Sequence, residues 1–310
     1  GSGTVTTLAG KITNNSSNSL IFTFDTPYCI NTGSQTIHIN SLRKRRSDIS
    51  VNSNYLASVT SDAKLLNKRQ VKLKKAGGTY QTITADAQDI YYPTSSDDYM
   101  YSAYAEVTDY VKQHKTGEYF VADIALREGE GGSAGFYGGW GLIVVYENPL
   151  MKWRDITIFD GHAYVASNGG NKELPVSRFN TVQQGPVGVK MGLMAGEGDV
   201  SITGDQFKIR NAANTAWINL SHGGNSTNNF FNSSIYTGGN ARNPELRNNT
   251  GLDISMFTLD NTNNSLIGNN QTSTNFQYNS TQDTYIIFCI AMAVDAYIPE
   301  IEAENHVWSI

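Results

Sequence analysis

Short apolar runs separated by turn-forming residues are the feature that most constrains the fold of this chain. The clearest case is the segment 136–165, FYGGWGLIVVYENPLMKWRDITIFDGHAYV. Its run LIVVY (142–146) predicts a strand buried on both faces, because a half-exposed strand would alternate apolar and polar residues. Asp160-Gly161 separates two further short runs and favours the type I′ turn of a tight hairpin. We therefore expect an antiparallel β nucleus in this segment.

Similar runs recur along the rest of the chain, and each predicts a strand. Glycines at 77 and 78 predict a hairpin over 71–84, and the nearly continuous apolar run 285–294 predicts a central strand. Only one helix is expected, beginning at Thr108 as its cap and stopped by Gly117. The remaining expected strands are 20–24, 36–40, 99–105, 119–126, 187–194 and 206–209. The prediction is an all-β fold, a large antiparallel β-sandwich or two abutting sandwiches, with one short helix near residues 108–115.

Length and composition are consistent with one large extracellular domain. The chain has 310 residues, of which 16% are charged, and it is rich in Tyr, Asn, Thr, Ser and Gly. Gly1-Ser2-Gly3 is typical of a cloning remnant, so we expect a single β-rich module over 4–300, with a subdivision near 166–186 as the alternative. We expect 301–310 to lead into a following repeat. No 18-residue apolar run occurs, so no transmembrane helix is expected.

The two cysteines leave two alternatives open. Cys289 lies inside the apolar run 285–294, which favours a buried thiol that behaves as a small hydrophobic residue. A disulfide between Cys29 and Cys289 would instead close the two ends of the domain and would indicate an oxidising compartment. Two cysteines are too few for a disulfide scaffold and offer no metal-ligand spacing.

A basic segment stands out against the net charge of −5. Residues 41–75 contain ten of the 23 Lys and Arg and only two acidic residues, with Arg43, Arg45 and Arg46 in its densest part. Such a run could bind an anionic glycan, a membrane surface or nucleic acid, or it could be a solvated loop. Because no aromatic residues interleave with it, as stacking platforms for bases would, we expect no nucleic-acid partner.

Aromatic residues near Asn-rich loops are the candidate ligand-binding residues. Eighteen of the 70 residues in 211–280 are Asn, which favours polar turns and offers amide groups to sugar hydroxyls. Aromatic rings can stack on sugar faces, and the candidates are Trp217, Tyr91, Tyr92 and Tyr236. The alternative for each is core packing or turn formation. Trp140, which opens the run 142–146, is assigned to the core.

Clustered carboxylates suggest a metal ion rather than catalysis. Glu197, Asp199 and Asp205 lie in glycine-rich turns and offer the oxygen ligands that Ca²⁺ prefers, although solvent-facing turn residues are the alternative. The five histidines are scattered, and neither a nucleophile elbow nor a nucleotide-binding glycine loop is present. We therefore expect no enzyme and no catalytic residues. A glycoside hydrolase, which needs two carboxyl groups facing each other across roughly 5–10 Å, is a remote alternative.

Four stretches taken together resemble a module of large bacterial surface proteins, the fibrillar or repetitive adhesins, in which it precedes arrays of immunoglobulin-like repeats. The resemblance covers about residues 70–300 and implies an exported, β-rich, non-enzymatic surface domain without assigning functional residues. The stretches are GWGLIVVYENP (139–149) with RDITIFDG (154–161), GEGD (196–199) with TGD (203–205), NSTNNFFNSSI (225–235), and VDAYIP (294–299). We expect an extracellular adhesin domain that binds a glycan or protein of a host or neighbouring cell. A structural spacer that projects another head from the cell surface is the main alternative.

Overall fold

The structure, a computed structural model, confirms the all-β prediction. It describes residues 66–91, 100–126, 137–238, 249 and 251–296, together with the backbone of the short strands β1 (Ser19–Phe22) and β2 (Gln35–His38). Cys29, Tyr92 and the basic run with Arg43, Arg45 and Arg46 lie outside the described residues, as does the expected lead 301–310. In the part that the structure describes, no helix is long and apolar enough to cross a membrane.

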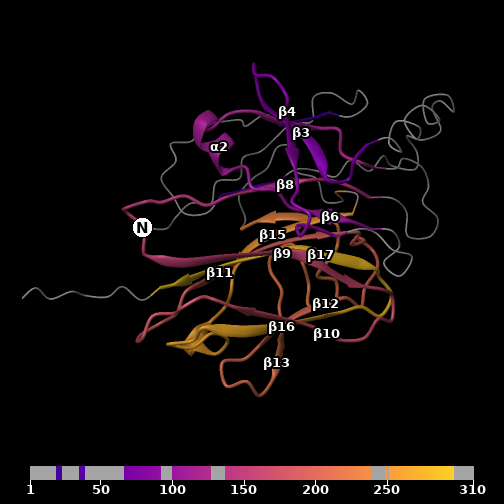
Figure 1. Cartoon of the computed structure of the whole chain (residues 1–310). Helices are drawn as coiled ribbons and strands as arrows, with labels where there is room; N and C mark the ends of the chain where they lie inside the picture. The colour runs from indigo at the N-terminus through magenta and orange to yellow at the C-terminus, as the bar shows by residue number, and fades with distance from the viewer. Residues whose placement is uncertain are drawn as a thin grey trace, which may run out of the picture.

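Two facing sheets form the sandwich, which occupies the lower part of Figure 1. One sheet has the order β14-β15-β11-β17-β9 and the other the order β10-β16-β12-β13. All pairings in them are antiparallel except the one between β14 and β15. The strands are β9 (Arg154–Val165), β10 (Lys172–Ser177), β11 (Val189–Gly196), β12 (Gln206–Arg210), β13 (Trp217–Asn219), β14 (Ile235–Thr237), β15 (Leu252–Thr258), β16 (Ser273–Asn279) and β17 (Tyr285–Asp295).

The main core lies between these two sheets. Alternate residues of β11 point into it, and from the opposite sheet Phe207 and Phe276 stack with their ring centroids 5.0 Å apart. The aromatic core is extended by Phe231 and Tyr285, which stack at 4.1 Å. Burial of each such side chain stabilises the fold by about 1.5–3 kcal/mol. The predicted central strand is confirmed, because β17 lies between β11 and β9.

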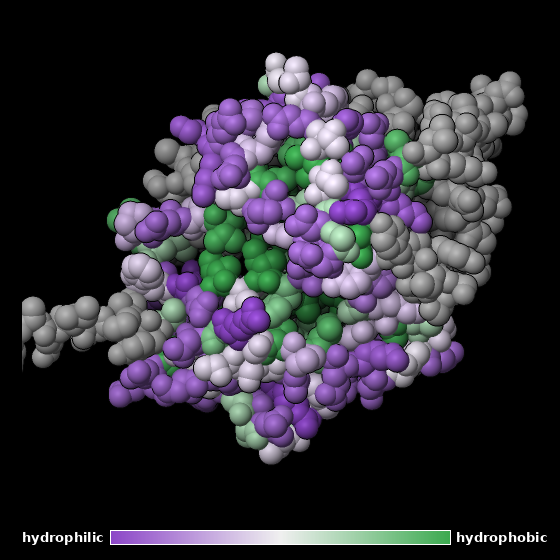
Figure 2. Space-filling view, viewed as in Figure 1, coloured by the Kyte–Doolittle hydropathy of each residue, from purple (hydrophilic) through white to green (hydrophobic). Residues whose placement is uncertain are grey.

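A second layer covers the outer face of the five-stranded sheet. Glycines permit this approach: a Cβ on Gly141 would lie 2.3 Å from Met194 Cε, and a Cβ on Gly196 would lie 2.3 Å from the ring of Tyr137. The thiol of Cys289 is free, and it is buried in the cluster that Met194 also joins. Figure 2, which has the same view as Figure 1, shows mostly polar residues on the face turned to the viewer, with apolar residues in a hollow at mid-height.

The N-terminal part adds smaller sheets and the predicted helix (Figure 1). The hairpin around Gly77, which has φ +76°, is confirmed as β3 and β4. Trp140 is half-buried against the small core formed around Leu73, Tyr110 and Tyr119. The remaining elements are β3 (Gln70–Lys75), β4 (Gln81–Thr84), β5 (Ile90–Tyr91), β6 (Ser102–Ala103), α2 (Thr108–His114), β7 (Tyr119–Ala122), β8 (Gly141–Val144) and the 3₁₀ turn η3 (Thr262–Asn264).

Both ends of helix α2 differ in detail from the prediction. The side chain of Thr108 does not cap the helix; Glu106 accepts a hydrogen bond from the Thr108 amide at 3.0 Å instead. The chain leaves the helix at Lys115, where φ is 58°, two residues before Gly117. A carboxylate at the N-terminus favours the helix because it complements the helix dipole.

Two predictions for the segment 136–165 are wrong. The run 142–146 is not buried on both faces: β8 pairs with β2 in a two-stranded sheet, and Val145 is 48% exposed. Asp160-Gly161 does not form a hairpin turn, because β9 continues through it. Gly161 and His162 together oppose Phe288, which makes a bulge in the pairing of β9 with β17. The long pairing with β17 outweighs the local turn preference.

Candidate functional site

The structure divides the predicted site residues between an exposed tip and a carboxylate cluster. The β12–β13 tip consists of the turn 211–216 and the residues that flank it, Arg210 and Trp217. Asn211 shapes the turn, since its side-chain oxygen accepts hydrogen bonds from the amides of Thr215 at 2.7 Å and Ala216 at 3.0 Å. Asn214 adopts φ 55°, a conformation that Asn tolerates better than most residues. The asparagines thus fix the backbone of the tip.

Arg210 and Trp217 form the surface of this tip. The guanidinium carbon lies 4.7 Å from the centroid of the Trp217 ring, and Arg210 Nε donates a hydrogen bond of 2.9 Å to Asn214 Oδ1. Trp217 is partly exposed, while Asn219 is exposed and Ile218 is 40% exposed. β13 is the outer strand of its sheet. An ordered indole, a cation and several amides therefore share one accessible edge.

The other predicted aromatic residues do not join this tip. Tyr91 is 40% exposed on β5 and stacks on His162, with ring centroids 5.9 Å apart. β9, which contains His162, adjoins β10 at the edge of the sandwich opposite to β13. Tyr236 is half-buried and stacks on His222 at 4.5 Å, against the main core. The predicted ligand residues that the structure describes therefore make no single patch.

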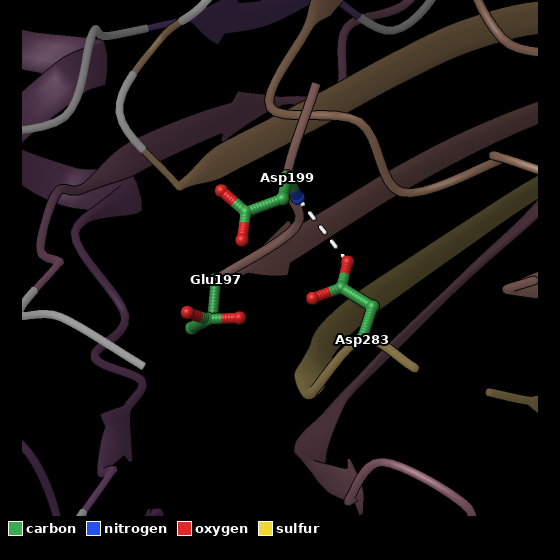
Figure 3. A group of neighbouring side chains, drawn as sticks. All are labelled: Glu197, Asp199 and Asp283. Atoms are coloured by element: carbon green, nitrogen blue, oxygen red, sulfur yellow. Dashed lines mark hydrogen bonds between the residues drawn. The ribbon is translucent and has the colours of Figure 1, made fainter. Parts of the chain in front are cut away.

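Glu197 and Asp199, both predicted metal ligands, meet Asp283 in a carboxylate cluster. One carboxylate oxygen of each residue lies within 4.8 Å of the others, and Figure 3 shows the three groups facing a common space. The antiparallel pairing of β11 with β17 explains the meeting, since Glu197 follows the end of β11 and Asp283 precedes the start of β17. The Asp199 amide donates a hydrogen bond of 3.2 Å to Asp283 Oδ2.

Burial and mutual repulsion both act on the carboxylates of the cluster. Glu197 and Asp283 are each only 2% exposed. Two carboxylates at such a separation repel by about 3 kcal/mol at an effective dielectric constant of 20. Burial raises the pKa of Asp283 to about 7, opposed by the hydrogen bond from Asp199 and reinforced by the charges of Asp199 and Asp205. A divalent cation would relieve this repulsion.

Asp205, the third predicted ligand, lies outside the cluster and has a structural contact. It is fully buried, and its Oδ1 accepts hydrogen bonds from the amides of Phe230 at 2.6 Å and Phe231 at 2.7 Å. Burial raises the pKa of Asp205 to about 6. It therefore fixes the loop that carries the two core phenylalanines.

Sequence reasoning missed two carboxylates, Asp283 and Asp253. Asp253 lies on β15, is fully buried, and its Oδ1 accepts hydrogen bonds from the amides of Asn232 at 2.9 Å and Ser234 at 3.1 Å. Burial raises the pKa of Asp253 well above its usual range. Asp253 could have been noticed in the sequence as an acidic residue at an inward position of the apolar run 252–259. A buried carboxylate is costly unless it has partners, so an acidic residue at such a position indicates a specific contact.

Comparisons with known proteins assign no family. No protein-family model matches the chain, and no curated protein matches it. One similar solved structure is described as "Crystal structure of BuGH86E322Q in complex with neoagarooctaose", with 8% sequence identity and a TM-score of 0.27. The match covers 90% of this chain and spans only 32% of that one. A TM-score this low establishes neither a shared fold nor a shared function.

Proposed function

We propose that the chain is an exported adhesion module of a bacterial surface protein, which binds a glycan or protein of a host or neighbouring cell without catalysis. The observation that carries the proposal is the β12–β13 tip, where Arg210, Trp217 and Asn214 are held in fixed contact at an accessible sheet edge. A rigid aromatic residue beside polar groups is typical of binding surfaces, because little conformational freedom is lost on binding.

The chemistry of the tip favours a carbohydrate ligand. An indole offers an apolar face to a sugar ring, and amides supply both donors and acceptors to its hydroxyl groups. Arg210 retains guanidinium N–H donors besides Nε, which could bind a carboxylate or sulfate on the glycan. We therefore infer that the preferred ligand is a glycan with acidic substituents.

The burial of the carboxylate cluster supports binding rather than glycoside hydrolysis. A hydrolase must bring a sugar between its two carboxyl groups, and the acid must have a raised pKa, as Asp283 has. However, Glu197 and Asp283 are 2% exposed, which leaves them inaccessible to a sugar ring. The cluster is better suited to a small ion than to a polysaccharide.

An array of glycans and extracellular-matrix proteins tests the proposal. The protein is applied with and without Ca²⁺, beside the variant Trp217→Ala and the matched control Trp153→Ala, which removes a 67% exposed tryptophan outside the tip. We expect saturable binding to one ligand class, retained by Trp153→Ala and lost in Trp217→Ala. Binding to nothing in either condition would instead favour the structural spacer.

A further inference from the structure

We propose that the outer face of the β3–β4 hairpin is a second binding surface, for a sulfated or carboxylated polysaccharide. This inference does not depend on the β12–β13 tip: in Figure 1, β4 lies at the top of the molecule and β13 at the bottom. β3 forms the end of the basic segment 41–75, which the proposed function leaves without a role. Residues 66–85 contain five Lys and Arg and no Asp or Glu, in a chain whose net charge is −5. The surface, called the hairpin face below, consists of Gln70, Lys72, Lys74, Tyr80, Thr82 and Phe120.

Alternation along β3 puts Lys72 and Lys74 on the same face of the hairpin, because successive side chains of a strand point to opposite faces. Leu73, which lies between them, is 4% exposed and packs into the small core with Tyr110 and Tyr119. The two lysines therefore point away from that core. Residues two apart in a strand are separated by about 6.5–7 Å, so the two cations are close neighbours on one surface.

Two aromatic rings from the neighbouring strands hold one of these cations. Lys74 Nζ lies 4.5 Å from the centroid of the Tyr80 ring and 4.9 Å from that of the Phe120 ring. Phe120 is the partner of Lys74 in the pairing of β3 with β7, and Tyr80 is 39% exposed just before β4. A cation over an aromatic face is attracted to it, so the ammonium is ordered before a ligand arrives. An anion then binds with a smaller loss of side-chain freedom.

Uncharged polar side chains complete the hairpin face. Lys72 Nζ donates a hydrogen bond of 2.6 Å to Thr82 Oγ1, and Gln70 lies two residues before Lys72 on the same side of β3. Both Gln70 and Thr82 are exposed. Among the residues that the structure describes, neither Lys72 nor Lys74 forms an ion pair with a carboxylate. The face thus presents two cations beside a hydroxyl and an amide group.

This combination fits an anionic polysaccharide better than a nucleic acid. Sulfate and carboxylate groups accept hydrogen bonds from ammonium groups, and sugar hydroxyls exchange hydrogen bonds with Thr and Gln side chains. Single-stranded nucleic acids bind by stacking their bases on aromatic faces. The rings of Tyr80 and Phe120 instead hold the ammonium of Lys74. The local excess of positive charge also raises the concentration of a polyanion near this surface, although the whole chain is negatively charged.

Titration with dextran sulfate tests the proposal, with unsulfated dextran as the neutral probe. We expect saturable binding of dextran sulfate alone. The double variant Lys72→Gln/Lys74→Gln should weaken this binding by at least roughly tenfold, because hydrogen bonds to charged groups are lost. Lys112→Gln/Lys172→Gln, which removes the same charge from exposed lysines elsewhere, is the matched control and should bind like the parent.

The tip variant separates this site from the proposed adhesive tip. Trp217→Ala should keep its affinity for dextran sulfate even if it loses its array ligand. Loss of dextran sulfate binding in Trp217→Ala would assign the polyanion to the tip and would overturn the proposal. A DNA duplex bound as tightly as dextran sulfate would overturn the assignment to a polysaccharide.

The salt dependence of binding and a conservative variant distinguish a direct contact from a folding defect. The slope of log Kd against the logarithm of the NaCl concentration should decrease by roughly one for each lysine removed, because each contact releases a counterion. Lys72→Arg/Lys74→Arg keeps both charges and should retain binding, since Arg also packs on aromatic rings. Equal affinity of the Gln pair and the parent would overturn the site, as would a loss in the Arg pair as large as in the Gln pair.

Discussion

Gly198→Ala should be severely destabilising, although it adds a single methyl group. Its Cβ would lie 2.3 Å from Asp253 Oδ2, 2.4 Å from the carbonyl oxygen of Phe231 and 2.6 Å from the carbonyl carbon of Phe231. Two of these three atoms belong to the backbone, so a side-chain rotation cannot relieve the contacts. The turn that contains Gly198 must therefore move away from the loop that contains Phe231.

The magnitude follows from two contributions. Overpacking in a closely packed region costs about 1–3 kcal/mol. Displacing Asp253 also weakens its hydrogen bonds to the amides of Asn232 and Ser234, each of which contributes about 1.5 kcal/mol or more. Together these predict a loss of about 4–6 kcal/mol in the free energy of unfolding, or roughly 10–20 °C in Tm.

Urea and thermal unfolding followed by circular dichroism measure this loss, with Gly192→Ala as the control. Gly192 lies on β11, where a Cβ would make only an ordinary contact of 3.4 Å with Ala291 Cβ. We expect this control to stay within about 1 kcal/mol of the parent. If Gly198→Ala were as stable as Gly192→Ala, the close packing of the turn 197–199 against Phe231 would be refuted.

Three further predictions concern the core, a buried histidine and the tip. Phe207→Ala, at a fully buried ring between the two sheets, should lower the free energy of unfolding by about 3–5 kcal/mol, measured by urea denaturation. Burial lowers the pKa of His222 to about 4 from 6.5, so between these values the unfolded chain binds more protons than the folded protein and stability falls as the pH drops. Between pH 7 and pH 5 this effect of His222 lowers the free energy of unfolding by about 1–2 kcal/mol. His222→Gln should therefore lose less stability than the parent over this pH range, by the same amount, when denaturation is measured at both pH values. Arg210→Ala, which removes the cation above the Trp217 ring, should weaken binding of an acidic glycan while changing Tm by less than roughly 2 °C. Unchanged affinity of Arg210→Ala in a titration would argue against a role of the guanidinium in binding.

The strands could be predicted because short apolar runs and their glycine and asparagine boundaries are local features. β17 and the hairpin around Gly77 were therefore predicted close to their observed bounds. β8 and Asp160-Gly161 show the limit of this reasoning. Whether an apolar run is central depends on how many strands pair with it, and whether an Asp-Gly pair turns depends on the strand beside it.

The candidate sites were predictable to a similar extent. Glu197 and Asp199 share one glycine-rich turn, so their proximity was visible in the sequence. Asp283 lies 84 residues beyond Asp199 and reaches it only through the pairing of β11 with β17, which the sequence does not specify. Asp205 was grouped with them because it is nearby in sequence, yet its Oδ1 holds the amides of Phe230 and Phe231. The contact of Trp217 with Arg210 likewise depends on the β12–β13 register.

One titration tests most directly the central claim, that the β12–β13 tip binds a ligand without catalysis. The strongest array ligand is titrated against the parent protein, Trp217→Ala and Trp153→Ala, and the ligand is then examined by mass spectrometry. We expect equal affinity for the parent and Trp153→Ala, at least roughly 30-fold weaker binding by Trp217→Ala, and an intact ligand in every mixture. Equal binding by Trp217→Ala would contradict the tip as the binding surface, and a shortened ligand would contradict binding without catalysis.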